Sequence, residues 1–141
     1  MSSEDVYTKV AGLTDVGMVR TNNEDTFLIS DFRSGEIFDC LAQQKRSLDD
    51  NSMLLIVSDG VGGAAVGEIA SNLTVHSINE ALSRLSWEIA AYDRLVAAIE
   101  QANYIVWHES RNNAAYQGMS ATATAVLIER DRAYIDRKSV V

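Results

Sequence analysis

Two long stretches in the middle of the chain carry apolar residues at the three- and four-residue spacing of one helix face. Over residues 64–85 these positions are Val66, Ile69, Ala70, Leu73, Ile78, Ala81, Leu82 and Leu85. Over residues 92–110 they are Leu95, Ile99, Ala102 and Val106. This periodicity predicts two consecutive amphipathic helices, each long enough to cover a sheet.

Strand-like segments lie on both sides of the predicted helices. They cover residues 9–14, 26–30, 53–57, 120–128 and 132–135. The run 53–57 is continuously apolar, which is typical of a strand covered on both faces. The polar stretch 35–51 predicts a loop with at most a short strand near Ile37, and nothing regular is expected after Ile135. Because the helices follow one another instead of alternating with strands, a layered α+β fold fits better than a doubly wound βαβ sheet.

Composition narrows the class of protein. The 141 residues contain no proline and no low-complexity linker, so we expect one soluble, globular domain. The net charge of −8 disfavours a nucleic-acid partner and an anionic membrane surface. The N-terminus has no signal-peptide character, and Cys40 is a lone thiol without cationic neighbours in the sequence. These features predict a cytoplasmic protein in which Cys40 is a small, unreactive side chain.

The first candidate site is the segment "GMVRTNNED", residues 17–25. Glu24 and Asp25 stand at the mouth of a predicted strand, and carboxylate oxygens are the ligands that Mg²⁺ and Mn²⁺ prefer. Arg20 carries a planar fork of donors suited to a phosphate group. Taken alone, the same residues also fit an ordinary solvated turn.

The second candidate site is "MLLIVSDGVGG", residues 53–63, where a buried strand runs into Asp59 and Gly60. A glycine here lets the backbone carbonyl approach a bound ion, although Asp-Gly is also a common turn pair. Nucleotide binding is an alternative, because residues 60–65 satisfy G-x-G-x-x-A between a strand and a helix. Glu80, the acidic residue about 20 positions on, falls inside the predicted helix, and Asp59 would repel a pyrophosphate, so we disfavour this alternative.

Three segments in register resemble the N-terminal half of the type 2C (PPM) metal-dependent serine/threonine protein phosphatases, especially bacterial members. They are "VGMVRTNNEDTF", "LLIVSDGVGGAAVGEIAS" and "QGMSATATAVLI". The resemblance covers residues 14–135 of a domain over 1–141, with 136–141 as an unmatched tail. It implies a β-sandwich flanked by antiparallel helices, with two Mn²⁺ or Mg²⁺ ions in a cleft and a phosphoserine or phosphothreonine protein as substrate.

The resemblance also implies a role for each candidate residue. Asp59 would bridge both ions, while the Gly60 carbonyl and Glu24 would bind one of them. Asp25 would support the metal site, and Arg20 would hold the substrate phosphate. Two cations about 3.5–4 Å apart activate a water for in-line attack on the phosphoryl group, without a covalent intermediate.

The chain also departs from the family pattern. Val61 stands where some relatives have a histidine, and no Gly-Asp-Ser motif or later pair of metal-binding aspartates follows Ile135. We therefore expect a truncated domain with one partial metal site and weak or no activity. The alternative is a catalytically dead phosphatase-like module that binds phosphoproteins through Arg20.

Overall fold

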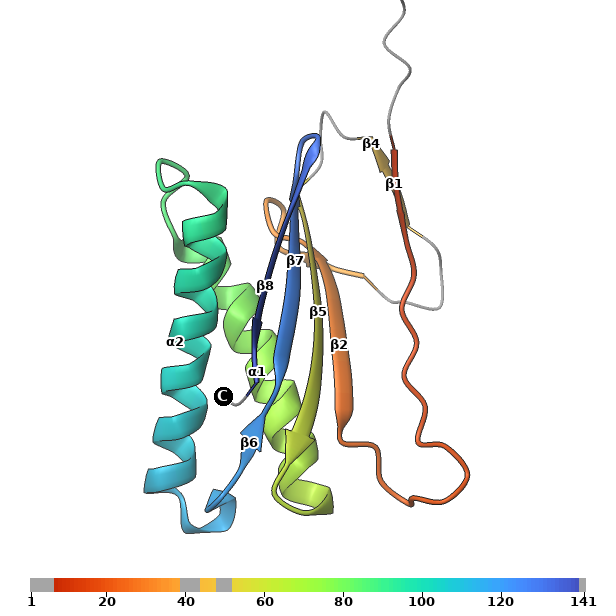
Figure 1. Ribbon diagram of the computed structural model, residues 1–141, viewed down its shortest axis with the longest axis vertical. Helices are drawn as coiled ribbons and strands as arrows, with labels where there is room; N and C mark the ends of the chain where they lie inside the picture. Colours follow the sequence, from red (N-terminus) through yellow and green to blue (C-terminus); the bar gives the residue numbers. More distant parts are fainter. Residues whose placement is uncertain (1–6, 39–43, 48–51, 140–141) are drawn as a thin grey trace, which may run out of the picture.

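The computed structural model describes residues 7–38, 44–47 and 52–139. Both predicted helices are present, as α1 (Ala64–Arg84) and α2 (Ala91–Asn112), and a short 3₁₀ helix, η1 (Ala114–Tyr116), follows them. The two long helices form an antiparallel hairpin that lies on one face of the sheet (Figure 1). No described helix is both long enough and apolar enough to cross a membrane.

The strands form one large sheet and one small ladder. Their bounds are β1 (Tyr7–Val10), β2 (Asp25–Asp31), β3 (Glu36–Ile37), β4 (Gln44–Ser47), β5 (Ser52–Val61), β6 (Ser120–Ala121), β7 (Ala123–Glu129) and β8 (Arg132–Lys138). The large sheet has the order β3-β2-β5-β7-β8, with β6 also paired to β5, and β1 pairs with β4. Every described strand pair is antiparallel. The dinucleotide alternative requires a parallel βαβ unit, and the described strands form none.

The main core lies between the sheet and the two helices. Side chains at alternate positions of β2, β5 and β7 point toward the helices, as the two-residue period of a strand requires. The sheet contributes Leu28, Leu54, Ile56, Ala123, Ala125 and Leu127, and the helices contribute Ala70, Val75, Ile78, Leu82, Leu95, Ile99, Ala102 and Val106. The predicted inner faces of both helices are therefore confirmed except at Ile69, which is 36% exposed.

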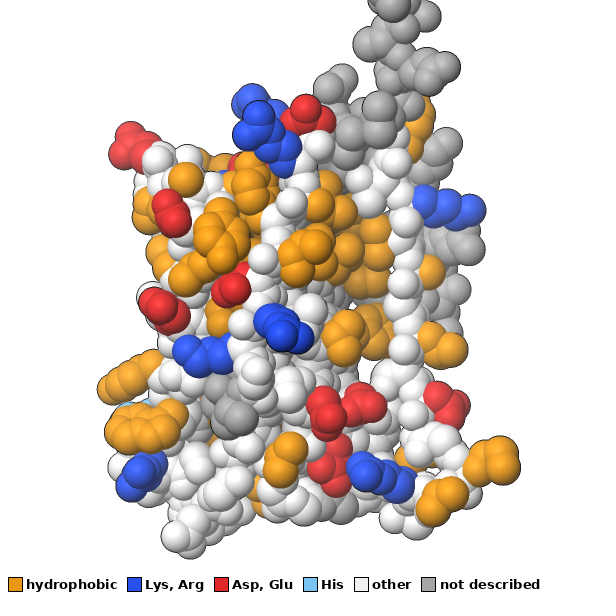
Figure 2. Space-filling model, viewed as in Figure 1, with side chains coloured by type: hydrophobic (Ala, Val, Ile, Leu, Met, Phe, Trp, Pro, Cys, Tyr) orange, Lys and Arg blue, Asp and Glu red, His pale blue; other side chains and the backbone are white. Residues whose placement is uncertain are grey.

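The opposite face of the sheet is only partly covered. A small cluster of Ile29, Phe38 and Met53 packs there with Val10 and Phe27. Beyond this cluster Val57 is 60% exposed, and Ile135 on β8 is 63% exposed. Hydrophobic side chains gather on this side over the sheet (Figure 2). The prediction that the strand over 53–57 is covered on both faces was thus wrong, because only the helix side is packed along its whole length.

Other differences concern the ends of strands. The predicted strand over 9–14 is Tyr7–Val10, and residues 11–14 are irregular. The last strand continues to Lys138, so the prediction of no regular structure after Ile135 was wrong. Register explains the extension, because Asp136, Arg137 and Lys138 pair with β7. The sequence also missed β4, whereas the short strand near Ile37 is confirmed. Cys40 lies outside the described residues.

One buried ion pair ties the helical layer to the sheet. Arg94 on α2 is 2% exposed, and its Nη2 donates to both carboxylate oxygens of Glu129 on β7, at 2.9 and 2.8 Å. Its Nε donates to the Ile89 carbonyl, and the guanidinium lies 4.5 Å from the centre of the Trp87 ring. A fully buried charge requires such a set of partners, so Arg94 fixes how α2 sits against the sheet.

Candidate metal and phosphate site

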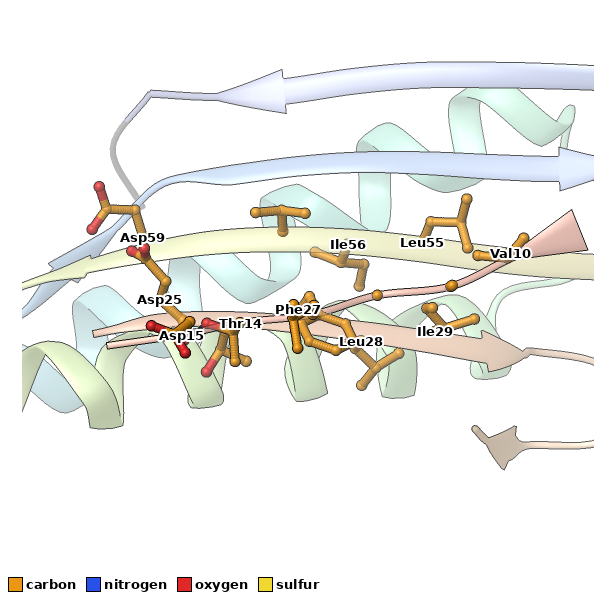
Figure 3. Close-up of a pocket in the computed structure, with 15 residues that line it drawn as sticks. Val10, Thr14, Asp15, Asp25, Phe27, Leu28, Ile29, Leu55, Ile56 and Asp59 are labelled. Carbon is orange, nitrogen blue, oxygen red and sulfur yellow. Dashed lines mark hydrogen bonds between the residues drawn. The ribbon is translucent and has the colours of Figure 1, made fainter. Parts of the chain in front are cut away.

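The antiparallel pairing of β2 with β5 places two of the predicted carboxylates directly opposite each other. Asp25 pairs with Asp59 in the register, and both side chains point away from the helices. Figure 3 shows Asp15, Asp25 and Asp59 at one end of a hollow of about 580 Å³ whose other end is apolar. The strand register therefore brings together carboxylates that are 34 positions apart in the sequence.

Glu24 and Gly60 form a second pair, on the helix side of the same strand ends. The Gly60 amide donates to the Glu24 carbonyl at 3.0 Å. Both residues also border Gly67, in the first turns of α1: a Cβ built there would overlap the Glu24 carboxylate and lie 3.0 Å from the Gly60 carbonyl oxygen. The Glu24 carboxylate and the Gly60 carbonyl consequently share one small space, as expected for two oxygens that are to bind one ion.

The loop before β2 is fixed by side chains that the sequence analysis did not single out. The Asn23 Oδ1 accepts a hydrogen bond from the Asp25 amide at 3.0 Å, and its Nδ2 donates to the Thr14 hydroxyl at 2.7 Å. The Thr14 hydroxyl in turn donates to the Asp25 carbonyl at 3.3 Å. Asn and Thr are common in such local side-chain-to-backbone bonds, which is the only sequence signal for this role.

Thr122 holds the other strand end in a similar way. The Asp59 amide donates to the Thr122 Oγ1 at 3.0 Å, and the Thr122 amide donates to the Asp59 carbonyl at 2.8 Å. The Ser58 hydroxyl also donates to the Thr122 carbonyl at 2.7 Å. Thr122 belongs to the alternating segment "SATATA", where the sequence indicates a strand but not which threonine faces Asp59.

Arg20 lies at the rim of a second hollow, of about 550 Å³. Glu24, Asp59 and Gly60 line the same hollow, and so does the turn through Gly63 that leads into α1. The start of α1 adds a partial positive charge that favours anions. Figure 2 shows acidic side chains beside a basic one at this end of the sheet. All five predicted residues, Arg20, Glu24, Asp25, Asp59 and Gly60, thus lie at one end of the fold.

The facing aspartate affects the ionisation of Asp25. The pKa of Asp25 is raised above its ordinary value of 3.8, first by partial desolvation, then by the negative charge of Asp59 and a hydrogen bond between the two carboxyls. The positive charge of Arg20 acts in the opposite direction. Two carboxylates held this close are unfavourable without a cation, and this makes the pair suited to binding one.

We expect Asp25→Asn to raise the thermal stability of the metal-free protein at pH 7. A raised carboxyl pKa means that the folded state binds the proton more tightly, so stability is lost as pH rises from about 3.8 through the folded pKa. Asparagine does not titrate in this range, so the variant does not lose this stability as pH rises. Melting curves in EDTA from pH 3.5 to pH 8 should show an advantage for Asp25→Asn that disappears at the acidic end. A constant difference over the whole range would contradict the assigned cause.

The described donors fit a hard divalent cation in part. Asp25 and Asp59 supply carboxylates on one side of the strand ends, and Glu24 with the Gly60 carbonyl supplies oxygens on the other. However, no group of three or more His, Cys, Asp or Glu side chains that could hold a metal ion exists among residues 7–38, 44–47 and 52–139. The described donors are therefore two pairs of oxygens and not one closed cluster of three ligating side chains.

Known proteins resemble this chain over most of its length. A family model described as Protein phosphatase 2C matches residues 39–136. The serine/threonine protein phosphatase PstP of Mycobacterium tuberculosis is 29% identical over 127 residues, which cover 88% of this chain and 20% of PstP. The serine/threonine phosphatase stp of Listeria monocytogenes is 26% identical over 125 residues, covering 86% of this chain and 43% of that protein.

Solved structures give the same family. The crystal structure of M. tuberculosis PstP matches with a TM-score of 0.63 and 26% identity over 94% of this chain and 46% of that one. The PstP catalytic domain in complex with two manganese ions matches with a TM-score of 0.62 and 25% identity over the same shares. The chain therefore spans less than half the length of these relatives.

Proposed function

Because the chain belongs to the protein phosphatase 2C family, of the bacterial PPM type, we propose that it carries the metal-bridging and phosphate-binding half of a serine/threonine phosphatase site. The observation that supports this most is the pairing of Asp25 with Asp59, with Glu24 and Gly60 behind it and Arg20 at the rim. The substrate would be a protein phosphorylated on serine or threonine, and the compartment the cytoplasm.

Each residue has a physical task in this proposal. Asp59, Asp25, Glu24 and the Gly60 carbonyl would hold Mn²⁺ or Mg²⁺, whose chemistry in such a site is to make a bound water nucleophilic near neutral pH and to offset phosphoryl charge. Arg20, on the exposed loop beside them, would bind two phosphate oxygens and hold the substrate phosphate at these strand ends. Asn23 and Thr122 keep the two strand ends in place through their hydrogen bonds to Asp25 and Asp59.

We expect the chain by itself to hydrolyse phosphopeptides slowly or not at all, because its described residues supply only a partial donor set. The test is release of inorganic phosphate from a phosphothreonine peptide with Mn²⁺, with EDTA and the Asp59→Asn variant as controls. A slow rate that needs both Mn²⁺ and Asp59 supports the proposal. Fast, Mn²⁺-dependent turnover would contradict the expected low activity but would support metal-dependent hydrolysis. Phosphate release that is unaffected by EDTA would contradict metal-dependent hydrolysis.

A second candidate function is binding of phosphoproteins without hydrolysis. It is favoured by the exposed position of Arg20 beside an incomplete metal site. In that case a labelled phosphopeptide should bind the Asp59→Asn variant as well as the wild type, and should lose affinity for Arg20→Ala. Equal binding by all three proteins would exclude this function.

A further inference from the structure

We propose that Gly67 is a positioning residue for Glu24, so that the missing side chain at position 67 makes the space in which Glu24 and the Gly60 carbonyl meet. This inference rests on the proposed function, since it concerns the metal-binding oxygens of that site. Gly67 lies inside α1 and is buried, and glycine inside a helix ordinarily lowers stability relative to alanine. A local reason for this glycine is therefore required.

The backbone at Gly67 does not itself require glycine. The glycines with positive φ are Gly17, Gly35, Gly62, Gly63 and Gly118, and Gly67 is not among them. Its amide donates to the Gly63 carbonyl at 2.8 Å, an ordinary helical bond. An alanine could adopt this conformation, so the reason for glycine must lie in what surrounds the missing side chain.

That surrounding is the candidate metal site. A Cβ at position 67 would overlap the Glu24 carboxylate, 2.8 Å from its Cδ, and would stand 3.0 Å from the Gly60 carbonyl oxygen. Apart from the local helix backbone, these are the nearest heavy atoms to that point. The added methyl would thus displace the Glu24 carboxylate, the side chain that must approach the ion, and press on the backbone carbonyl beside it.

The contact between β5 and α1 is also close when it is viewed from Gly60 on the strand. A Cβ at Gly60 would overlap the backbone carbonyl of Gly67. Two glycines that face each other across the β5–α1 junction therefore let the helix backbone approach the strand end, and Glu24 fills what remains of the gap. Gly67 acts on the ion only through Glu24 and Gly60, which is why we describe it as a positioning residue.

The test is a double-mutant cycle of the full chain in EDTA, with wild type, Gly67→Ala, Glu24→Ala and the double variant. We expect Gly67→Ala to lower the melting temperature when Glu24 is present. In the Glu24→Ala background the same change should lower it clearly less or raise it, because the methyl no longer meets a carboxylate and alanine favours the helix. An equal drop in melting temperature from Gly67→Ala in the wild-type and Glu24→Ala backgrounds would overturn the inference.

A second measurement separates positioning from mere packing. Mn²⁺ affinity by calorimetry should fall roughly ten- to a hundredfold in Gly67→Ala, as for other residues that orient a metal ligand. Asn72→Ala, a change at a half-buried position of the same helix away from Glu24, should leave the affinity unchanged. Affinity equal to wild type in Gly67→Ala would contradict the inference. If the wild type bound no Mn²⁺, the proposed function would fail, but the metal-free cycle would still decide the role of Gly67.

Discussion

Replacing Gly60 with alanine is expected to destabilise the fold by about 3 kcal/mol, which is at the upper end for overpacking a well-packed site. The added Cβ would lie 2.5 Å from the carbonyl carbon of Gly67 and 3.1 Å from the Glu24 carbonyl oxygen. Both obstacles are backbone atoms, which cannot move aside by a change of rotamer. Helix α1 would have to shift away from β5, and this would also disturb the packing of its buried face.

The measurement is urea unfolding of Gly60→Ala beside a matched glycine variant. Gly35→Ala is suitable, because Gly35 has a φ of +74° and no neighbour within 4 Å of its would-be Cβ. Its expected cost is only the strain of the left-handed backbone, about 1 kcal/mol. If the two variants lost similar stability, the close approach of Gly60 to Gly67 would not be the reason for glycine at position 60.

Asp59→Asn is expected to reverse the response of the protein to Mn²⁺. In EDTA the variant should melt higher than the wild type at pH 7, because the mutual repulsion of Asp25 and Asp59 is gone. With Mn²⁺ at a hundred times its dissociation constant the wild type should gain about 2.7 kcal/mol, or roughly 10 °C for a domain of this size. The variant should gain little, so the order of the two melting temperatures should invert.

The matched control is Asp131→Asn, in the exposed turn between β7 and β8. It removes the same charge at a distance from the strand ends, and its melting temperature should rise with Mn²⁺ as in the wild type. An equal Mn²⁺ response of Asp59→Asn and Asp131→Asn would mean that the cation acts on the general negative charge of the surface. That outcome would remove the main support for a metal site at β2 and β5.

The spacing of apolar residues was sufficient to predict the two helices and the general class of the fold. Apolar positions such as Leu95 and Ile99 are repeated at helical spacing, and they are buried in the structure. The same spacing did not predict how far the face of the sheet opposite the helices is covered. A run such as 53–57 is equally apolar whether one or both faces are covered, and the exposure of Val57 depends on which segments pack there. The continuation of β8 through Lys138 likewise follows from pairing with β7 and not from its own polar residues.

The sequence predicted which residues form the candidate site, and the structure shows how these residues are placed relative to one another. Sequence motifs singled out Glu24, Asp25 and Asp59 but could not state that Asp25 and Asp59 face each other while Glu24 turns to the helix side. That division follows from strand register, a long-range property. The supporting roles of Asn23 and Thr122 are hydrogen bonds between distant or irregular segments, for which one sequence gives only a weak signal.

The most direct test of a metal site at the paired ends of β2 and β5 is calorimetric titration of Mn²⁺ into the metal-free wild type and the Asp59→Asn variant at pH 7. We expect saturable binding of one Mn²⁺ per wild-type chain and loss of that binding in Asp59→Asn. Binding of the same stoichiometry and affinity in both proteins, or no binding by the wild type, would contradict the claim that the paired ends of β2 and β5 hold the metal.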